Sequence, residues 1–248
     1  MKLNYSMVSE TGLRRSNNED AVLFYKPEKP WIEQSMGILA VVSDGMGGYA
    51  RGEKASAMTV DVLKEFYYNS VGSPEDTLQK AAVEVNNAIA TEGIASEQKM
   101  GATCTAMVIL KDRLCLLHIG DSRGYLFQNG TLSQITTDHT VANEMAQSAK
   151  LRNSGQTMLF NPHALTKAMG MELINSCQAD VFSIKNTLEK GDRILLCSDG
   201  LFLHVKDREL EEILQQKIPL KDLTDKLVKM VMQRGANDNF SFILIQYE

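Results

Sequence analysis

Leu39-Ala-Val-Val-Ser-Asp44-Gly45-Met46-Gly47-Gly48 is an apolar strand that ends in a carboxylate and three glycines around Met46. The same form recurs far along the chain in Ile194-Leu-Leu-Cys-Ser-Asp199-Gly200-Leu201. A third acidic turn, Gly235-Ala-Asn-Asp238-Asn239, precedes the apolar run 240–247. A carboxylate at the end of a buried strand, freed by a following glycine, can hold a hard cation at a sheet edge. If these turns converge, they form a metal site.

The composition is that of an ordinary globular protein. The chain has 248 residues, 44% of them hydrophobic and 23% charged, and no linker-like run divides it, so we expect a single domain over 1–248. A net charge of -5 argues against nucleic acid or an anionic membrane as the main partner. No apolar run reaches the ~18 residues of a membrane span. Four singly spaced cysteines favour reduced thiols and a cytoplasmic location.

Turn residues and apolar periodicity predict the elements. Strands are expected at 2–10, 21–25, 37–43, 103–111, 113–119, 123–128, 180–184, 192–197 and 240–247. Helices are expected at 55–68, 75–90, 206–216 and 220–234. Two helical pairs in different thirds of the chain do not fit strict alternation of strand and helix, so we predict an α+β fold with helices covering antiparallel sheets.

Three connections carry specific predictions. Gly120-Asp121-Ser122 separates two strand-like runs and predicts a hairpin, and Gln128-Asn129-Gly130 predicts a further turn. The polar, weakly patterned stretch 139–161 predicts an insertion on the surface beside a site.

The candidate site residues each have a simpler alternative. Arg15, Glu19 and Asp20 share a loop before a strand, which fits either a phosphate clamp or an exposed charged turn with a local ion pair. Glycines weaken the end of a strand unless the backbone must bend or approach another group closely. The glycines after Asp44 therefore favour a functional site over a plain glycine-rich turn before a helix. Asp121, Asp199 and Asp238, taken singly, fit ordinary turns equally well.

The motifs taken together resemble the PPM family, the metal-dependent serine/threonine protein phosphatases also called protein phosphatase 2C. The matching stretches run in family order from Gly12 to the C-terminus. They are Arg15-Ser-Asn-Asn-Glu19-Asp20, Val42-Ser-Asp44-Gly45-Met-Gly-Gly48, Gly101-Ala-Thr103, Ile119-Gly120-Asp121-Ser122-Arg123, Leu165-Thr166-Lys-Ala168-Met-Gly170, Leu196-Cys-Ser198-Asp199-Gly200 and Asp238-Asn239-Phe-Ser241. Seven motifs in order are far more specific than any one of them.

The resemblance implies a four-layer α-β-β-α sandwich with a metal centre at one end. It implies that Asp44 bridges two ions, that the Gly45 carbonyl binds one of them, and that Asp199 and Asp238 complete the set. Asp121, with Asp199, would hold a third, weaker ion. Glu19, Asp20 and Asn239 would act through water or hydrogen bonds, and Arg15 would bind the substrate phosphate. A site built from oxygen ligands suits Mn²⁺ or Mg²⁺.

The implied activity is hydrolysis of phosphoserine and phosphothreonine in proteins, opposing a serine/threonine kinase, by a cytoplasmic monomer. The stretch 139–161 corresponds to the variable flap of the family. Many eukaryotic relatives have a histidine at the position of Met46, and that histidine is thought to protonate the leaving alkoxide. A thioether cannot donate a proton, so the resemblance implies that metal-bound water, or no donor at all, takes this role. The alternative from another class is a catalytically silent module that binds a phosphoprotein. A third possibility is the same chemistry on an anti-sigma antagonist or a secretion-system component.

Overall fold

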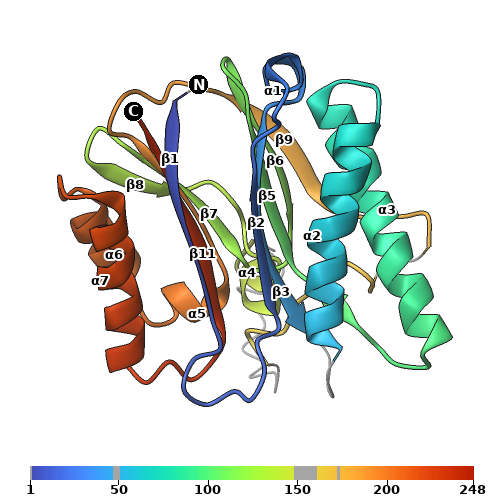
Figure 1. The fold of residues 1–248 in the computed structure, drawn as a ribbon. Helices are drawn as coiled ribbons and strands as arrows, with labels where there is room; N and C mark the ends of the chain where they lie inside the picture. The colour runs from blue at the N-terminus through green and yellow to red at the C-terminus, as the bar shows by residue number, and fades with distance from the viewer. Residues whose placement is uncertain (1, 47–50, 148–160, 172–173) are drawn as a thin grey trace.

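The computed structural model describes residues 2–46, 51–147, 161–171 and 174–248, which form two antiparallel sheets packed face to face (Figure 1). The first sheet has the order β1 (Leu3–Glu10), β11 (Phe240–Tyr247), β10 (Arg193–Cys197), β7 (Arg123–Gln128) and β8 (Thr131–Gln134). The second has the order β2 (Asp20–Tyr25), β3 (Ile38–Met46), β5 (Cys104–Ile109), β6 (Arg113–Ile119) and β9 (Asp180–Lys185), with β4 (Gly101–Ala102) paired to β3.

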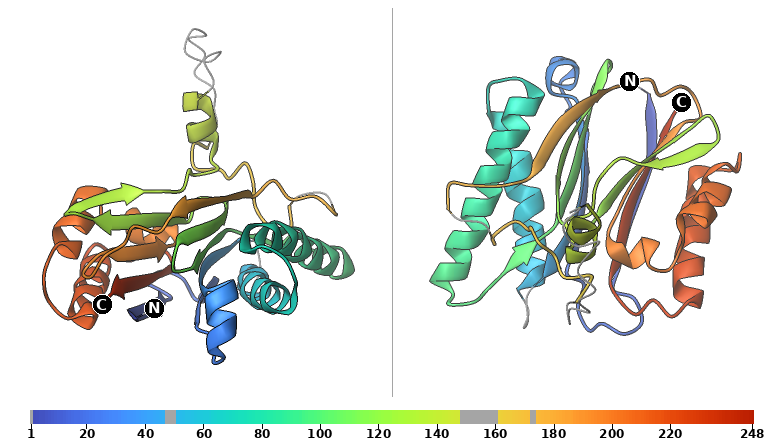
Figure 2. Two further views of the ribbon diagram at one scale, coloured as in Figure 1. Left: turned by 90° about the horizontal axis from the view of Figure 1, so that it is seen from above. Right: turned by 180° about the vertical axis from the view of Figure 1, so that it is seen from behind.

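Helices cover the outer face of each sheet. The second sheet carries α2 (Gly52–Asn69) and α3 (Pro74–Ala95), and the first carries α6 (Asp207–Leu214) and α7 (Leu220–Gln233) (Figure 1). Two short helices lie at connections, α1 (Pro30–Met36) and α5 (Asp199–Phe202). A third, α4 (Val141–Gln147), projects away from the sheets (Figure 2). The predicted α+β sandwich of four layers is confirmed.

The position of β3 explains why its first five residues, 38–42, are all apolar. Ile38, Ala40 and Val42 belong to the cluster between the two sheets, whereas Leu39 and Val41 pack with the cluster under α2 and α3. All five are fully buried. A strand with both faces covered loses the usual alternation of polar and apolar residues. The continuous apolar run before Asp44 therefore follows from the central position of β3.

Local signals start α3 where the periodicity predicts it, although the helix runs past the predicted end at Ala90 to Ala95. The Ser73 side chain accepts a hydrogen bond of 3.1 Å from the backbone N–H of Asp76, and Pro74 occupies the first turn. The predicted apolar stripe is buried against the sheet; it consists of Leu78, Ala82, Val85 and Ile89. The cap and the stripe together set where the helix begins and which face it buries.

The predicted hairpin around Asp121 is wrong. Strand β6 pairs with β5 and β9 in the second sheet, whereas β7 pairs with β10 and β8 in the first. The chain thus crosses from one sheet to the other at Gly120-Asp121-Ser122, with Gly120 at φ +104°. By contrast, the predicted turn at Asn129 and Gly130, both with positive φ, is confirmed and connects β7 to β8.

Several boundaries also differ from the sequence prediction. Strand β3 does not end at Ser43 but runs on to Met46, because Gly45 and Met46 pair with β4. Asp199 opens the helix α5 where a simple turn was expected. The helices α1 and α4 and the short strand β8 were not predicted. The predicted insertion at 139–161 contains α4, and its part from 148 to 160 lies outside the described residues, as do Gly47 and Gly48.

Two further observations concern the cysteines and the helices. Cys104, Cys115 and Cys197 are buried free thiols, as the sequence predicts, and Cys177 is half-buried with its sulfur 3.8 Å from that of Met169. Among the helices of the described ranges, none combines the length and the apolar character that crossing a bilayer would require.

The core between the sheets yields a first prediction. Ile243 of β11 is fully buried there, so Ile243→Ala should lower the free energy of unfolding by about 2–5 kcal/mol through lost burial and a residual cavity. Val71 is 96% exposed, and Val71→Ala should change it by no more than about 0.5 kcal/mol. Urea denaturation of both variants checks this, and equal effects would contradict the assigned core.

Candidate active site

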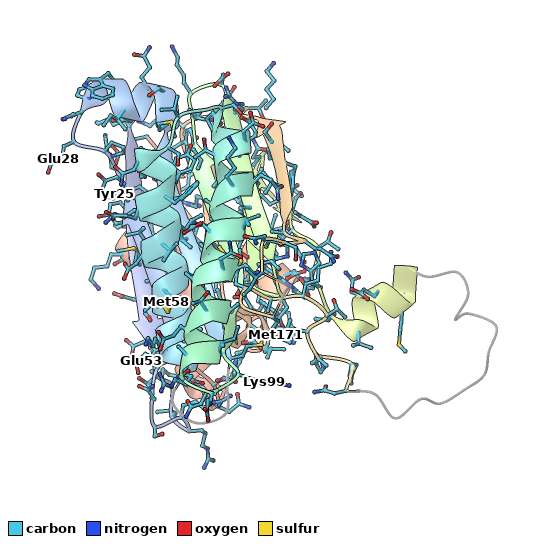
Figure 3. The ribbon with its side chains drawn as sticks, turned by 90° about the vertical axis from the view of Figure 1, so that its right-hand side faces the viewer. Tyr25, Glu28, Glu53, Met58, Lys99 and Met171 are labelled. Carbon is cyan, nitrogen blue, oxygen red and sulfur yellow. The ribbon has the colours of Figure 1, made fainter. Side chains whose placement is uncertain are left out.

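All of the predicted site residues except Asp20 line one cavity, at the edge where β3 ends and β11 begins, at the bottom of Figure 1. The cavity has a volume of 620 Å³. Its walls include Arg15, Glu19, Asp44, Gly45, Met46, Thr103, Asp121, His163, Met171, Asp199, Asp238 and Asn239. In Figure 3, Met171 lies at the same lower end of the molecule as Glu53 and Lys99. The walls of the cavity thus bring together carboxylates from segments that are far apart in the sequence.

Asp20 and Asp44 face each other across the pairing of β2 and β3. Asp20 is 9% exposed, and its Oδ2 accepts a hydrogen bond of 2.8 Å from the Ser198 hydroxyl. Its Oδ1 is buried and has no hydrogen-bond partner among the described residues. A buried carboxylate oxygen without a partner is costly, so this atom indicates that something positive or protonated completes the site.

The glycines after Asp44 and Asp199 allow two close backbone approaches. A Cβ on Gly45 would overlap the backbone carbonyl of Gly52 at the start of α2. A Cβ on Gly200 would overlap the backbone carbonyl of Asn239. The first approach brings β3 against α2, and the second brings α5 against the turn before β11. The repeated Asp-Gly pair is therefore required by packing at both places.

Asn239 joins the N-terminal loop to the turn that contains Asp238. Its side-chain oxygen accepts a hydrogen bond of 2.9 Å from the backbone N–H of Glu19. Its amide nitrogen donates to the carbonyls of Thr11 at 2.9 Å and Asn17 at 2.8 Å. These three bonds hold the loop that carries Arg15 and Glu19 beside Asp238. Asn239 is expected from the sequence to act through hydrogen bonds, and these three are the bonds that its side chain makes.

Arg15 lies at the rim of the cavity, paired with Asp238. Its Nη2 is 2.8 Å from Asp238 Oδ2 and its Nε is 2.8 Å from Asp238 Oδ1. The hydrogen bond with Asp238 raises the pKa of Arg15, so the guanidinium is charged. Its side chain is 50% exposed, which leaves it open to a ligand from solvent. A forked donor in this position suits an oxyanion.

The remaining carboxylates repel one another in a buried setting. Burial, followed by the charges of Asp20 and Asp199, raises the pKa of Asp44 well above its ordinary value. Burial likewise raises the pKa of Asp20 to about 7 and that of Asp199 to about 6. It also raises the pKa of Asp121 to about 7. The cluster thus attracts protons or cations at neutral pH.

The chemistry of this donor set fits divalent cations. The cavity is lined by Asp44, Asp121, Asp199 and Asp238, whose carboxylates are hard ligands of the kind that Mn²⁺ and Mg²⁺ prefer, and by Gly45, whose backbone carbonyl is a ligand of the same kind. Within the described ranges, no three His, Cys, Asp or Glu side chains already stand as a complete ligand group. Asp238 is not free to join such a group, because its carboxylate is hydrogen-bonded to Arg15.

Some residues of the site were missed by the sequence prediction. Ser43 donates a hydrogen bond of 2.6 Å to the Thr103 carbonyl, and Ser198 binds Asp20. Both are fully buried, and each precedes an Asp-Gly pair, so the repeated serine was a signal that could have identified them. The Thr103 hydroxyl accepts a bond of 2.8 Å from the N–H of Asp44. His163, which belongs to none of the sequence motifs, also lines the cavity.

Comparisons with known proteins agree with this geometry. The sequence profile of the family described as protein phosphatase 2C matches residues 14–244. The serine/threonine phosphatase stp of Listeria welshimeri is 30% identical over 96% of this chain and 93% of its own. The serine/threonine protein phosphatase PstP of Mycobacterium tuberculosis is 32% identical over 98% of this chain, which spans 44% of that protein.

Solved structures agree as well. The serine/threonine phosphatase of S. agalactiae superposes with a TM-score of 0.85 at 27% identity, covering both chains completely. The catalytic domain of PstP, in complex with two manganese ions, superposes with a TM-score of 0.78 at 32% identity, covering 98% of this chain and 97% of that one.

The raised carboxylate pKa values predict how the metal-free protein responds to pH. Since Asp20, Asp121 and Asp199 have folded-state pKa values of about 6 to 7, the folded protein binds more protons than the unfolded chain between about pH 4 and 7. The free energy of unfolding should therefore fall as the pH rises through this window. Urea denaturation in the presence of a chelator measures it.

A control isolates the site. Asp199→Asn removes one of the titrating groups, so its stability should decline less steeply over the same window. Saturating Mn²⁺ should offset the decline, because an ion bound only by the folded state stabilises it. Stability that rises from pH 4 to 7 without metal, in both proteins, would contradict the repulsion assigned to this cluster.

Proposed function

We propose that this chain, which belongs to the protein phosphatase 2C family, hydrolyses phosphoserine and phosphothreonine in proteins with the help of two Mn²⁺ or Mg²⁺ ions. The observation that carries the proposal is the convergence of Asp44, Asp121, Asp199 and Asp238 on one cavity with Arg15 at its rim. The names of the relatives, and the two manganese ions of the PstP structure, support it.

The residues that would hold the ions follow from their places in the cavity. Asp44, which lines the cavity close to Asp199, would serve as a ligand of both ions. The Gly45 carbonyl, Asp199 and Asp238 would complete the pair, and Asp121 with Asp199 would take a third, weaker ion. When bound, the two ions lower the pKa of a water and offset charge on the phosphoryl oxygens.

Arg15 would bind and orient the phosphoryl group. Its forked donors already lie beside Asp238 at the mouth of the cavity, held there by the loop that Asn239 anchors. A bidentate guanidinium fixes the direction of a phosphate as well as its charge. The phosphate would enter from solvent, where the guanidinium is half exposed. Asp20 and Glu19 would orient water and neighbouring ligands through hydrogen bonds.

The leaving alkoxide needs a proton that Met46 cannot give. Met46 lines the cavity at the end of β3, and its thioether has no acidic hydrogen. The leaving group would therefore take its proton from a water bound at the site, or would leave without a proton donor. The methionine would act as an apolar wall beside the reacting group.

The substrate class and setting extend the proposal. A phosphoprotein made by a serine/threonine kinase would be the substrate, and the enzyme would act as a monomer, since one chain supplies the whole carboxylate set. Free buried thiols support a cytoplasmic location. A silent phosphoprotein-binding module is the less favoured function, because Asp44, Asp199 and Asp238 are all kept. An anti-sigma antagonist and a secretion-system component both remain within the proposed substrate class.

The decisive experiment is hydrolysis of a phosphothreonine peptide with and without metal. Full chelation should abolish phosphate release, and Asp199→Asn should lower it by at least about tenfold, since it removes a ligand that two ions share. Asp225 is an exposed partner of Lys221 on α7, so Asp225→Asn is the matched control and should retain full activity. Activity that survives chelation, or that Asp199→Asn leaves unchanged, would refute the proposal.

Met46 and Asp44 should differ sharply when replaced. Asp44→Ala removes the central ligand and should abolish measurable turnover. Met46→Ala should cost far less than the about 10²- to 10⁴-fold that general acid catalysis contributes. Initial rates on the same peptide at saturating Mn²⁺ compare the two. Losses of similar size would mean that Met46 takes a direct part in the chemistry.

A further inference from the structure

Asp121 sits in the segment that crosses from one sheet to the other, where no ladder of backbone hydrogen bonds continues through it. Its side chain lines the cavity of the carboxylates and also an adjoining hollow of 1190 Å³. Gly120, just before it, and Arg123, two residues after it, are bound by two consecutive residues of another segment, His139 and Asp138.

His139 makes two hydrogen bonds to Gly120. Its backbone N–H donates to the Gly120 carbonyl at 2.8 Å. Its ring Nδ1 accepts from the Gly120 N–H at 3.1 Å. One residue therefore binds both polar groups of the residue immediately before Asp121. A side chain at Gly120 would collide with Thr103, so this close passage of the chain has little freedom to shift.

The second nitrogen of the ring is also engaged. Since a backbone N–H can only donate, Nδ1 of His139 carries no proton, and Nε2 carries the proton of the neutral imidazole. Nε2 lies 3.3 Å from Asp180 Oδ2, to which it donates. His139 is 6% exposed, and burial lowers its pKa, which agrees with the neutral form. Asp180, at the start of β9, thus sets the orientation of the ring.

Asp138 holds the other side of Asp121. Arg123 donates from Nε to Asp138 Oδ1 at 3.0 Å and from Nη2 to Asp138 Oδ2 at 2.7 Å. The same guanidinium lies over the ring of Phe202, 3.8 Å from its centroid. A bidentate pair with a stacked guanidinium has a single well-defined geometry. Both flanks of Asp121 are therefore fixed by neighbouring residues of one segment.

We propose that Asp138 and His139 are positioning residues that hold Asp121 in place for a third divalent ion, with Asp180 orienting His139. The proposal rests on the proposed function, because that is where Asp121 is assigned as a ligand. Partners of ligand residues typically change metal affinity by about 10- to 100-fold when they are removed. In the clamp formed by these two residues, His139 acts on the backbone of Gly120 and Asp138 acts on the side chain of Arg123.

Calorimetric titration of the metal-free full-length chain with Mn²⁺ tests this. His139→Ala should weaken the ion that Asp121→Ala weakens, by about 10- to 100-fold, and leave the other ions unchanged. His139→Asn should retain the wild-type affinity, because its amide oxygen can accept the Gly120 N–H. Asp180→Ala, at a 45% exposed side chain, should give a smaller loss and provides a second variant if His139→Ala fails to fold.

A double variant separates positioning from general destabilisation. Asp121→Ala with His139→Ala should bind Mn²⁺ like Asp121→Ala alone, because the clamp then has no ligand to position. An added loss in the double variant, or equal losses in His139→Asn and His139→Ala, would overturn the proposal. If Asp121→Ala alters no ion, its assigned role as a ligand fails and the clamp with it, while the two-ion activity stands on the separate Asp199→Asn test.

The ring itself offers a readout without metal. Nitrogen-15 spectra of the metal-free protein should show Nδ1 of His139 unprotonated and Nε2 protonated. In Asp180→Ala the proton should be less strictly confined to Nε2 of His139. In His139→Ala the amide resonance of Gly120 should shift, because its hydrogen bond to Nδ1 is lost. The opposite tautomer in the wild-type protein would exclude the Gly120 hydrogen bond and overturn the clamp.

Discussion

Mutual repulsion among buried carboxylates is the constraint on which the rest of this structure depends. Asp20, Asp44, Asp121 and Asp199 have raised pKa values because they are buried and close to one another. Such a cluster is unfavourable by itself, and it persists because the two apolar clusters under the helices and the one between the sheets hold the strands in place. The packed sandwich therefore maintains a site that favours binding of divalent cations.

Neutral hydrogen bonds orient several of the buried groups around the carboxylates, and the ion pairs of Arg15 with Asp238 and of Arg123 with Asp138 lie around them. Thr103 binds the backbone of Asp44, Ser198 binds Asp20, and Asn239 ties the N-terminal loop to the turn of Asp238. Neutral donors orient a carboxylate or its backbone without cancelling its charge. Only Arg15 contributes a lasting positive charge among the described residues of the cavity wall, and it stands at the rim. The interior keeps its negative charge available for cations.

The sequence could predict those parts of the arrangement that depend on neighbouring residues, but not those that depend on residues far away in the chain. Asp44 and Asp199 were predictable because each ends a buried apolar run and is followed by a glycine, which are local signals. The strand ladder that adds Gly45 and Met46 to β3 was not, since it needs the distant β4. Helix α1 is short and has no buried residue, and β8 spans four residues, so neither had a periodic pattern long enough to detect.

The failed hairpin prediction and the position of Asp121 have the same cause. Gly120-Asp121-Ser122 looks like a tight turn from its residue types, but those types do not specify which strands lie beside β6 and β7. The partners β9 and β10, which come later in the chain, draw the two strands into different sheets. A tight hairpin would have kept Asp121 within one sheet. Because the chain crosses between them instead, Asp121 faces the cavity where the carboxylates meet, and a segment outside both sheets must hold its neighbours in place.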